Sequence, residues 1–440
     1  MTKSEGLVTA MKPVATRRRN LAVKAGAVMA VVVFMLTACG SSEKLTAAGS
    51  GDSPTYTKLR PGVVDPTPED TKALDALPES VRPDYAGFWN STRLGPNPYA
   101  GWKAPKAPWK LCYSSAYQGN SWRVEGLKTA QLLTQQLRDK GLVKDDLAVT
   151  DANNDGTLQA NQITNLTQQG CNVIFAMQPP TIGVCKAFDA AKKAGTLVIA
   201  MQTGTDCTNV IQSDSGAFAA GNRTATWLAE QIKPGSTVVM CKGIPGVAAA
   251  EARQLGAKVA LESAGMKVDS ITGEWNSATV KSQMVNYLST HQGDVAGVWD
   301  GGVCAAPVIQ AFKQAGRRLP VVTGFEGSCN WMAATKNNGL KTIGFAAGGG
   351  QGVVEAYRIA LRMLSGQSPK VNTLLYPLAE VNPSNFDEYY DKAMTENSSC
   401  SVQPKDGASV PDSYYDALFT GGQPAPQIES VLDTKHLPIQ

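Results

Sequence analysis

The chain has 440 residues, of which 43% are hydrophobic and only 18% are charged, so it can form more than one hydrophobic core. The first 38 residues contain six basic residues and one acidic residue, which accounts for the net charge of +4, while the rest holds 35 basic and 36 acidic residues. A nearly neutral body lacks the basic surface that nucleic-acid binding needs, and two histidines are too few for a multi-histidine metal centre. We therefore expect no nucleic-acid partner, no metal and no cofactor.

The N-terminus has the order of a bacterial export signal. The basic run 17–19 precedes an apolar stretch, 25–36, that is too short to span a bilayer. The following Leu-Thr-Ala-Cys ends at Cys39 and resembles a lipobox, in which cleavage precedes a cysteine that then receives a lipid. The pattern predicts a lipoprotein signal peptide at 1–38 and a protein anchored by lipid on Cys39 to the extracytoplasmic face of the cell membrane. An ordinary secretory signal with an incidental cysteine is the alternative.

The region between the signal and the first regular element has no apolar periodicity. Residues 39–72 are rich in Ser, Gly, Thr and Pro, which is typical of a flexible tether. Residues 73–108 contain aromatic residues and several prolines, so we predict an irregular segment that wraps the surface of the following domain.

From Trp109 onward, short apolar runs alternate with amphipathic stretches, a pattern that predicts parallel strands covered by helices on both faces. Four such units precede residues 234–235 and about four follow. The sequence therefore predicts an α/β fold of two doubly wound parallel-sheet lobes. The expected strands are 110–114, 147–150, 172–177, 197–201, 237–241, 268–272, 295–300, 321–324 and 342–345. The expected N-terminal lobe is 109–233 plus 347–370, the C-terminal lobe is 234–346 plus 371–385, and 386–440 form an extension.

Several short motifs occur in an order that resembles the type I periplasmic substrate-binding proteins of sugar ABC transporters, in particular the ribose-binding-like branch. The likeness covers about 109–385, and its motifs are 151–155, 212–215, 243–253, 274–276 and 322–327. The resemblance implies that the chain crosses three times between the lobes at a hinge and that a ligand is trapped in the cleft between them.

The resemblance also implies the residues of this cleft. Aromatic rings interleaved with carboxylates and amides suit a sugar, because its C–H faces stack on rings and its hydroxyl groups form hydrogen bonds. The implied residues are Ser115, Gln118, Asn120, Trp122, Gln202, Thr203, Glu251, Arg253, Trp275, Asn276, Trp299, Asp300, Phe325 and Glu326. A glycine-rich run at 348–352 lacks the lysine of a phosphate loop and favours a hinge crossover, from which Gln351 would reach the ligand. Core packing of the tryptophans and helix capping by Asp300 and Glu326 are the alternatives.

The chain departs from the ribose-binding pattern at several of these positions. Gln202 and Thr203 stand where the family has an Asp-Arg pair, Glu251 stands where it has an arginine, and Gly302 stands where it has an asparagine. These changes leave fewer charged side chains to form hydrogen bonds with ligand hydroxyl groups. We therefore expect a small neutral polar ligand, a sugar or a polyol, other than ribose.

Eight cysteines remain once Cys39 carries the lipid, and an exported protein is expected to use them in disulfides. Cys185 and Cys207 occupy positions in the first lobe that correspond to those of Cys304 and Cys329 in the second. This repeat predicts the disulfides Cys185–Cys207 and Cys304–Cys329. The pairs Cys112 with Cys171 and Cys241 with Cys400 are left over by elimination.

We find no nucleophile–base pair or metal-spaced histidines that would indicate an enzyme. The leading hypothesis is a monomeric, non-enzymatic solute receptor that closes around its ligand and delivers it to an ABC permease. A surface sensor that presents the closed form to a signalling partner is the second hypothesis. An extracellular sugar hydrolase that uses Glu251, Asp300 and Glu326 is the third.

Overall fold

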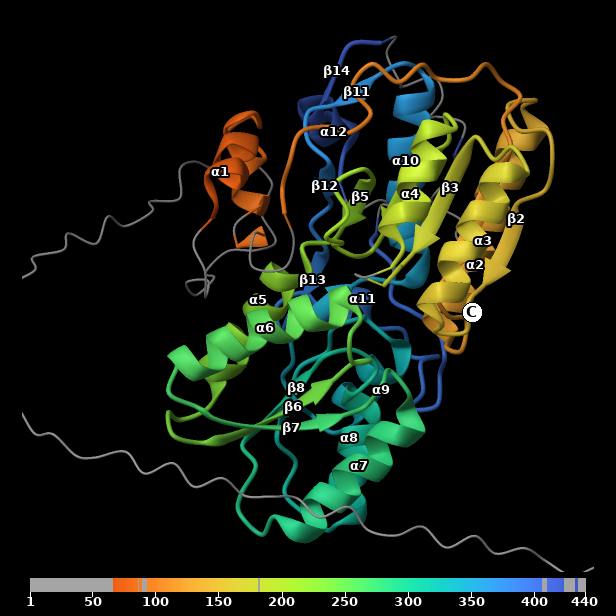
Figure 1. The fold of residues 1–440 in the computed structure, drawn as a ribbon. Coiled ribbons are helices and arrows are strands. Elements are labelled where there is room, and N and C mark those ends of the chain that lie inside the picture. Colours follow the sequence, from red (N-terminus) through yellow and green to blue (C-terminus); the bar gives the residue numbers. More distant parts are fainter. Residues whose placement is uncertain are drawn as a thin grey trace, which may run out of the picture. The chain divides into compact units, whose positions relative to one another are not determined.

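The computed structural model describes residues 66–85, 87–88, 93–180, 183–405, 410–422 and 432–433 (Figure 1). The predicted signal peptide, Cys39 and most of the predicted tether lie outside these residues. Within the described ranges, no helix has the length and apolar character needed to cross a membrane.

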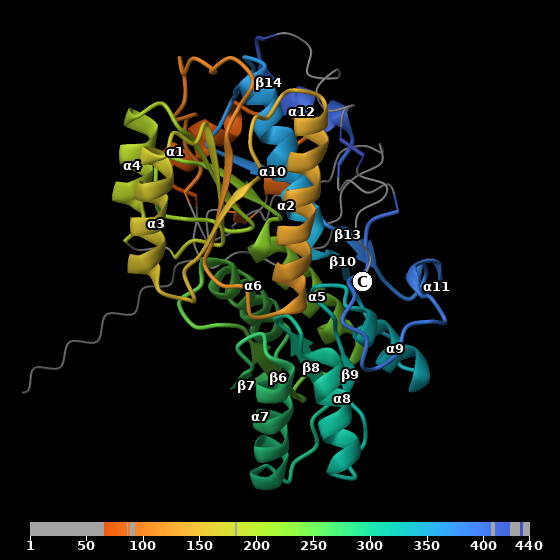
Figure 2. The same cartoon turned by 90° about the vertical axis from the view of Figure 1, so that its right-hand side faces the viewer.

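The first lobe is built on a six-stranded parallel sheet with the strand order β12-β5-β4-β3-β1-β2. Successive residues of its central strands face opposite sides: Ile174 packs with helices α3 and α4, whereas Phe175 stacks on Tyr357 of α10 at 4.3 Å between ring centres. Helices α2 and α10 therefore cover one face, and α3 and α4 cover the other (Figure 2). The strands are β1 (Leu111–Ser115), β2 (Ala148–Asp151), β3 (Val173–Met177), β4 (Leu197–Met201), β5 (Ile211–Asp214) and β12 (Thr373–Leu375). The helices are α2 (Ser121–Asp139), α3 (Gly156–Gln168), α4 (Cys185–Lys193) and α10 (Gly349–Leu364).

The second lobe contains a four-stranded parallel sheet with the order β7-β6-β8-β9. Its helices α5 and α6 pack unusually closely, because a Cβ atom at Gly221 would lie 2.0 Å from the Arg253 carbonyl oxygen and one at Gly256 would lie 2.1 Å from that of Phe218. The strands are β6 (Thr237–Lys242), β7 (Lys267–Thr272), β8 (Gly297–Asp300) and β9 (Val321–Val322). The helices are α5 (Ala217–Gln231), α6 (Ala248–Ser263), α7 (Ser277–Thr290), α8 (Ala305–Gln314) and α9 (Cys329–Asn337). A separate antiparallel pair joins β10 (Gly344–Ala346) to β13 (Ala379–Val381).

Three crossings connect the lobes, in agreement with the expected architecture. They lie between β5 and α5, between β10 and α10, and between β12 and β13. Two of them differ in position from the boundaries expected from the sequence. Helix α5 packs on α6 and on the second sheet, so the first crossing comes at 214–217 and not at 233. Strand β12 pairs with β5 of the first sheet, so the last crossing follows residue 375 and not residue 370.

Segments from both ends of the described chain pack on the first lobe. Between 66 and 102, the helix α1 (Pro68–Asp75) and the 3-10 helix η1 (Arg82–Tyr85) precede an extended stretch, and the Tyr85 hydroxyl donates to the Thr373 carbonyl at 2.9 Å. Near the other end, β14 (Phe419–Thr420) pairs with β11 (Ser368–Pro369), and α12 (Asp412–Leu418) packs on α10 through Tyr415 and two arginines of α10. The short helix α11 (Phe386–Tyr389) packs against α9 of the second lobe, with the rings of Phe386 and Trp331 6.3 Å apart.

Four disulfides join the eight described cysteines. They are Cys112–Cys171, Cys185–Cys207, Cys241–Cys304 and Cys329–Cys400. Cys185–Cys207 agrees with the prediction, and so does the first of the pairs left over. The prediction of Cys304–Cys329 is wrong, and with it the pairing of Cys241 with Cys400.

The reason for the wrong pairing is the order of the strands. Strand β6 lies beside β8, and Cys241 stands opposite Asp300, so the start of α8 brings Cys304 to Cys241. Cys329 instead meets the C-terminal extension, which runs beside it through a bridge between Ser328 and Ser401.

Candidate functional site

A small cavity is lined by residues from both lobes and from the crossings between them. It has a free volume of about 20 Å³, which is enough for about one water molecule. A sugar can therefore enter only when side chains move or the lobes separate. The lining residues include Trp122, Gln202 and Gln351 from the first lobe and Arg253, Phe325 and Glu326 from the second, all six of them among the predicted ligand-binding residues.

Arg253 organises the wall that the second lobe contributes. Its Nη1 donates to the carbonyl oxygen of Gly301 and to Oε1 of Glu326, both at 3.0 Å. Its guanidinium carbon lies 4.0 Å from the ring centre of Phe325 and 5.3 Å from that of Trp275. The arginine is 5% exposed, so its charge is balanced inside the protein by Glu326.

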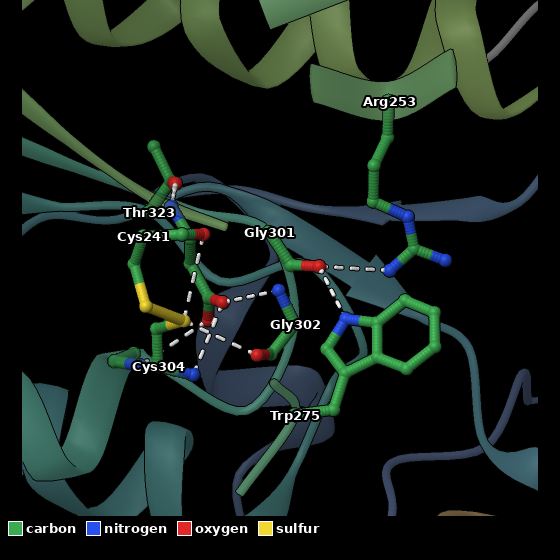
Figure 3. Close-up of a disulfide and its surroundings, with 9 residues drawn as sticks. Cys241, Arg253, Trp275, Gly301, Gly302, Cys304 and Thr323 are labelled. Carbon is green, nitrogen blue, oxygen red and sulfur yellow. Dashed lines mark hydrogen bonds between the residues drawn. A yellow bond between two sulfur atoms is a disulfide. The ribbon is translucent and has the colours of Figure 1, made fainter. Parts of the chain in front are cut away.

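Trp275 lies beside Arg253 and donates a hydrogen bond to the same carbonyl group, that of Gly301. Its Nε1 donates to the Gly301 oxygen at 3.0 Å, so both side chains converge on one acceptor (Figure 3). The neighbouring Gly302 has a φ of +124°, and a Cβ atom there would lie 2.8 Å from Trp275 Nε1 and 2.9 Å from Glu326 Oε1. The glycine at the position where an asparagine was expected is therefore required by this local packing.

The loop that contains Gly301 and Gly302 is also held by Asp300 and by a disulfide. The Asp300 carboxylate accepts hydrogen bonds from the backbone N–H groups of Gly302, Cys304 and Ala305. Cys304 is bonded to Cys241 at the end of β6, as Figure 3 shows. Burial raises the pKa of Asp300 to about 7, even though these N–H groups favour the charged form. Asp300 thus shapes the loop that carries Gly301 and does not line the cavity.

Arg123 was not among the predicted site residues; it lies in the first turn of α2 and is 1% exposed. Its Nη2 donates to Oε1 of Gln178, while its Nε and Nη1 have no hydrogen-bond partner among the described residues. The guanidinium carbon lies 5.7 Å from the ring centre of Tyr117 and 5.8 Å from that of Trp275, so this residue of the first lobe reaches the second. Burial lowers the pKa of Arg123 from its usual value. A signal was present, because an arginine beside Trp122 at a helix start after a strand can point toward the carboxyl end of the sheet.

Other predicted residues of the first lobe have structural roles. Ser115 Oγ accepts from Gln118 Nε2 at 2.8 Å and organises the loop after β1. Asn120 is the N-cap of α2, where its side chain accepts from the Arg123 N–H, and Thr203 donates to the neighbouring Gly204 carbonyl. The structure does not place these four side chains on the cavity.

The second lobe gives three similar corrections. Glu251 is exposed, accepts from the Gly246 N–H, and lines a separate surface hollow with Lys242 and Lys258. Asn276 caps α7 through the N–H groups of its first turn. Trp299 is fully buried and its Nε1 donates to Thr224 Oγ1 of α5, so it belongs to the core. Their position near the end of a strand was therefore not enough to predict whether these side chains face the cleft.

A comparison with protein families gives a match over residues 111–368 to the periplasmic binding protein domain, which is more than half of the chain. The chain belongs to this family. Among curated periplasmic binding proteins, the ribose import binding protein of Bacillus subtilis is 22% identical over 195 residues, which cover 44% of this chain and 63% of that protein. The xylitol-binding protein of Mycolicibacterium smegmatis is 24% identical over 261 residues, covering 57% of this chain and 72% of that protein. The chain spans slightly less than two thirds of the two ribose import binding proteins that it matches.

Solved structures of periplasmic binding proteins share the fold. An ABC transporter solute binding protein from Thermobispora bispora superimposes with a TM-score of 0.60 at 20% identity, covering 76% of this chain and 99% of that one. A second, from Mycobacterium smegmatis with bound glycerol, gives a TM-score of 0.57 at 20% identity, covering 66% and 99%. The two-lobed architecture and its three crossings are thus those of a periplasmic binding protein.

Proposed function

We propose that this protein is the solute-binding component of an ABC importer and that it traps a small polyhydroxylated ligand, of the sugar or polyol class, between its lobes. The observation that carries the proposal is the cavity that both lobes line, with Trp122 and Gln202 on one side and Arg253, Phe325 and Glu326 on the other. Rings offer surfaces for sugar C–H groups, and the amide and charged groups offer partners for hydroxyl groups. The relatives named for ribose and xylitol support this class.

The arrangement of carboxylates favours binding over hydrolysis. Glycoside hydrolysis needs two carboxyl groups that face each other across a sugar bond. Here Glu326 is paired with Arg253, Asp300 is held by three backbone N–H groups, and Glu251 is exposed away from the cavity. Of the alternatives from the sequence, we therefore favour a receptor without catalytic activity. Delivery to a permease and a lipid anchor at Cys39 are part of the same proposal.

A thermal-shift screen against pentoses, hexoses, polyols and nucleosides tests the ligand class. We expect a polyhydroxylated compound to raise the melting temperature, because a ligand that binds only the folded state stabilises it. Calorimetry on the best compound should then give one site per chain. A screen in which only amino acids or peptides stabilise the protein would contradict the proposal.

A further inference from the structure

The guanidinium group of Arg123 has unused hydrogen-bonding capacity next to Trp275 of the second lobe, beside the cavity. The side chain is 1% exposed, and its Nε and Nη1 have no acceptor within the part of the chain that the structure describes, although Nη2 donates to Gln178. Among the residues that the structure describes, no carboxylate oxygen forms an ion pair with it within 4.0 Å. It shares the ring of Trp275 with Arg253, which lines the cavity.

The two arginines of the cleft differ in how their charge is balanced. Arg253 has Glu326 at 3.0 Å, whereas Arg123 donates a hydrogen bond, among the described side chains, to the neutral Gln178. The residues that follow β4 add no charge, since they are Gln202, whose carbonyl accepts from Gln178, and Thr203. Glu326 attracts Arg123 only from beyond ion-pair distance, and Arg253 repels it. A buried guanidinium without a carboxylate in contact is unfavourable, because it loses its hydration and gains little from an opposite charge.

We propose that the ligand carries a carboxylate that pairs with Arg123 when the cleft closes. This inference rests on the proposed function, narrows its ligand class to a sugar acid or a polyol acid, and departs from the neutral ligand expected from the sequence. Nε and Nη1 of Arg123 bind the carboxylate oxygens, while the cluster of Arg253, Trp275 and Glu326 contacts the hydroxyl groups and C–H faces. A phosphate monoester carries up to about two negative charges, more than one guanidinium balances. A neutral hydroxyl group would use an N–H but leave the charge unpaired.

Titration calorimetry with matched pairs tests the proposal. The pairs are D-gluconate with D-glucitol, D-ribonate with ribitol, and D-galacturonate with D-galactose, and D-glucose 6-phosphate represents phosphate esters. We expect the acid of at least one pair to bind about tenfold to a hundredfold more tightly than its neutral partner, as the loss of a hydrogen bond to a charged group would cause. Preference for the phosphate ester over every carboxylate would overturn the proposal.

Arg123→Gln assigns the preference to this residue. We expect the variant to lose much more affinity for the acid than for the neutral partner, so that the preference for the acid largely disappears, and Arg123→Lys to recover part of the preference because it keeps the charge. Arg138→Gln is the matched control, since Arg138 lies on the same helix but is paired with Asp146 at the surface. The melting temperature and the affinity for the neutral partner show whether each variant is folded.

The outcomes separate this inference from the proposed function. If neutral members bind as tightly as their acids and Arg123→Gln changes neither affinity, the carboxylate is wrong while the sugar or polyol receptor stands. If no member of any pair binds and the wider screen of polyhydroxylated compounds also fails, both are wrong.

Discussion

Gly302 is the residue whose replacement should disturb the site most locally. Its φ of +124° and the closeness of Trp275 and Glu326 leave no room for a Cβ atom. We expect Gly302→Ala to lower the free energy of unfolding by about 1–3 kcal/mol and to weaken ligand binding, because the ring of Trp275 must shift. Gly293→Ala is the control, since a Cβ atom at Gly293 would meet nothing within 4 Å. Urea unfolding and calorimetry measure the two effects, and equal behaviour of the two variants would contradict this interpretation.

The second prediction for a single residue concerns Asp300 and the pH dependence of stability. Burial raises the pKa of Asp300 to about 7 from an ordinary 3.8. The folded chain then keeps a proton that the unfolded chain releases. The contribution of the Asp300 proton to the free energy of unfolding is complete below pH 3.8 and declines as the pH rises to about 7. Asp300→Asn has no such proton, so the stability of the wild type relative to this variant should fall across that range. Urea unfolding from about pH 4 to about pH 8 measures the difference, which would stay constant if the prediction were wrong.

Individual residues also mark the limit of prediction from the sequence. The resemblance to sugar-binding proteins implied that Trp122, Arg253, Phe325 and Glu326 lie on the cleft, and the structure brings them to one cavity. Trp299 was misplaced because its burial depends on Thr224 of α5, a partner 75 residues away in sequence. Arg123 was missed for a similar reason, since its burial is completed by Trp275 of the other lobe.

At the scale of elements, the close packing of α5 and α6 positions Arg253. A Cβ atom at Gly221 would lie 2.0 Å from the carbonyl oxygen of Arg253 itself. We expect Gly221→Ala to push the helices apart, to destabilise the protein by about 1–3 kcal/mol, and to weaken ligand binding. Lys258→Ala on the exposed side of α6 serves as the control. Thermal unfolding and calorimetry test this, and an unchanged affinity would show that Arg253 does not depend on the helix contact.

The second prediction at the scale of elements concerns which cysteines are joined by disulfides. A non-reducing digest analysed by mass spectrometry should contain a peptide pair linked by Cys241–Cys304 and another linked by Cys329–Cys400. A Cys304–Cys329 pair would contradict the structure.

Apolar periodicity predicted nine strands and the two lobes but not β5 or β12, and the family resemblance implied the three crossings. The partners of Cys304 and Cys329 could not be predicted from the repeat, because they depend on the order of strands in space and on where the C-terminal extension runs.

The whole molecule is a two-lobed periplasmic binding protein whose cleft residues come from both lobes. The boundaries expected for the lobes missed the crossing before α5, because alternation along the chain does not indicate which sheet a helix packs on.

The proposed lipid anchor on Cys39 would hold the protein at the membrane. Cys39→Ala should move it from the membrane fraction to the soluble fraction and abolish metabolic labelling by a fatty acid. Unchanged fractionation and labelling would exclude the lipid anchor.

The central claim is that a small polyhydroxylated ligand binds between the lobes at Arg253. Titration calorimetry of the wild type and of Arg253→Gln with the best compound from the screen tests it most directly, with Arg318→Gln as a surface control. We predict one site per chain, a loss of about a hundredfold in affinity for Arg253→Gln, and no change for Arg318→Gln. Equal affinity of Arg253→Gln and the wild type would contradict the account.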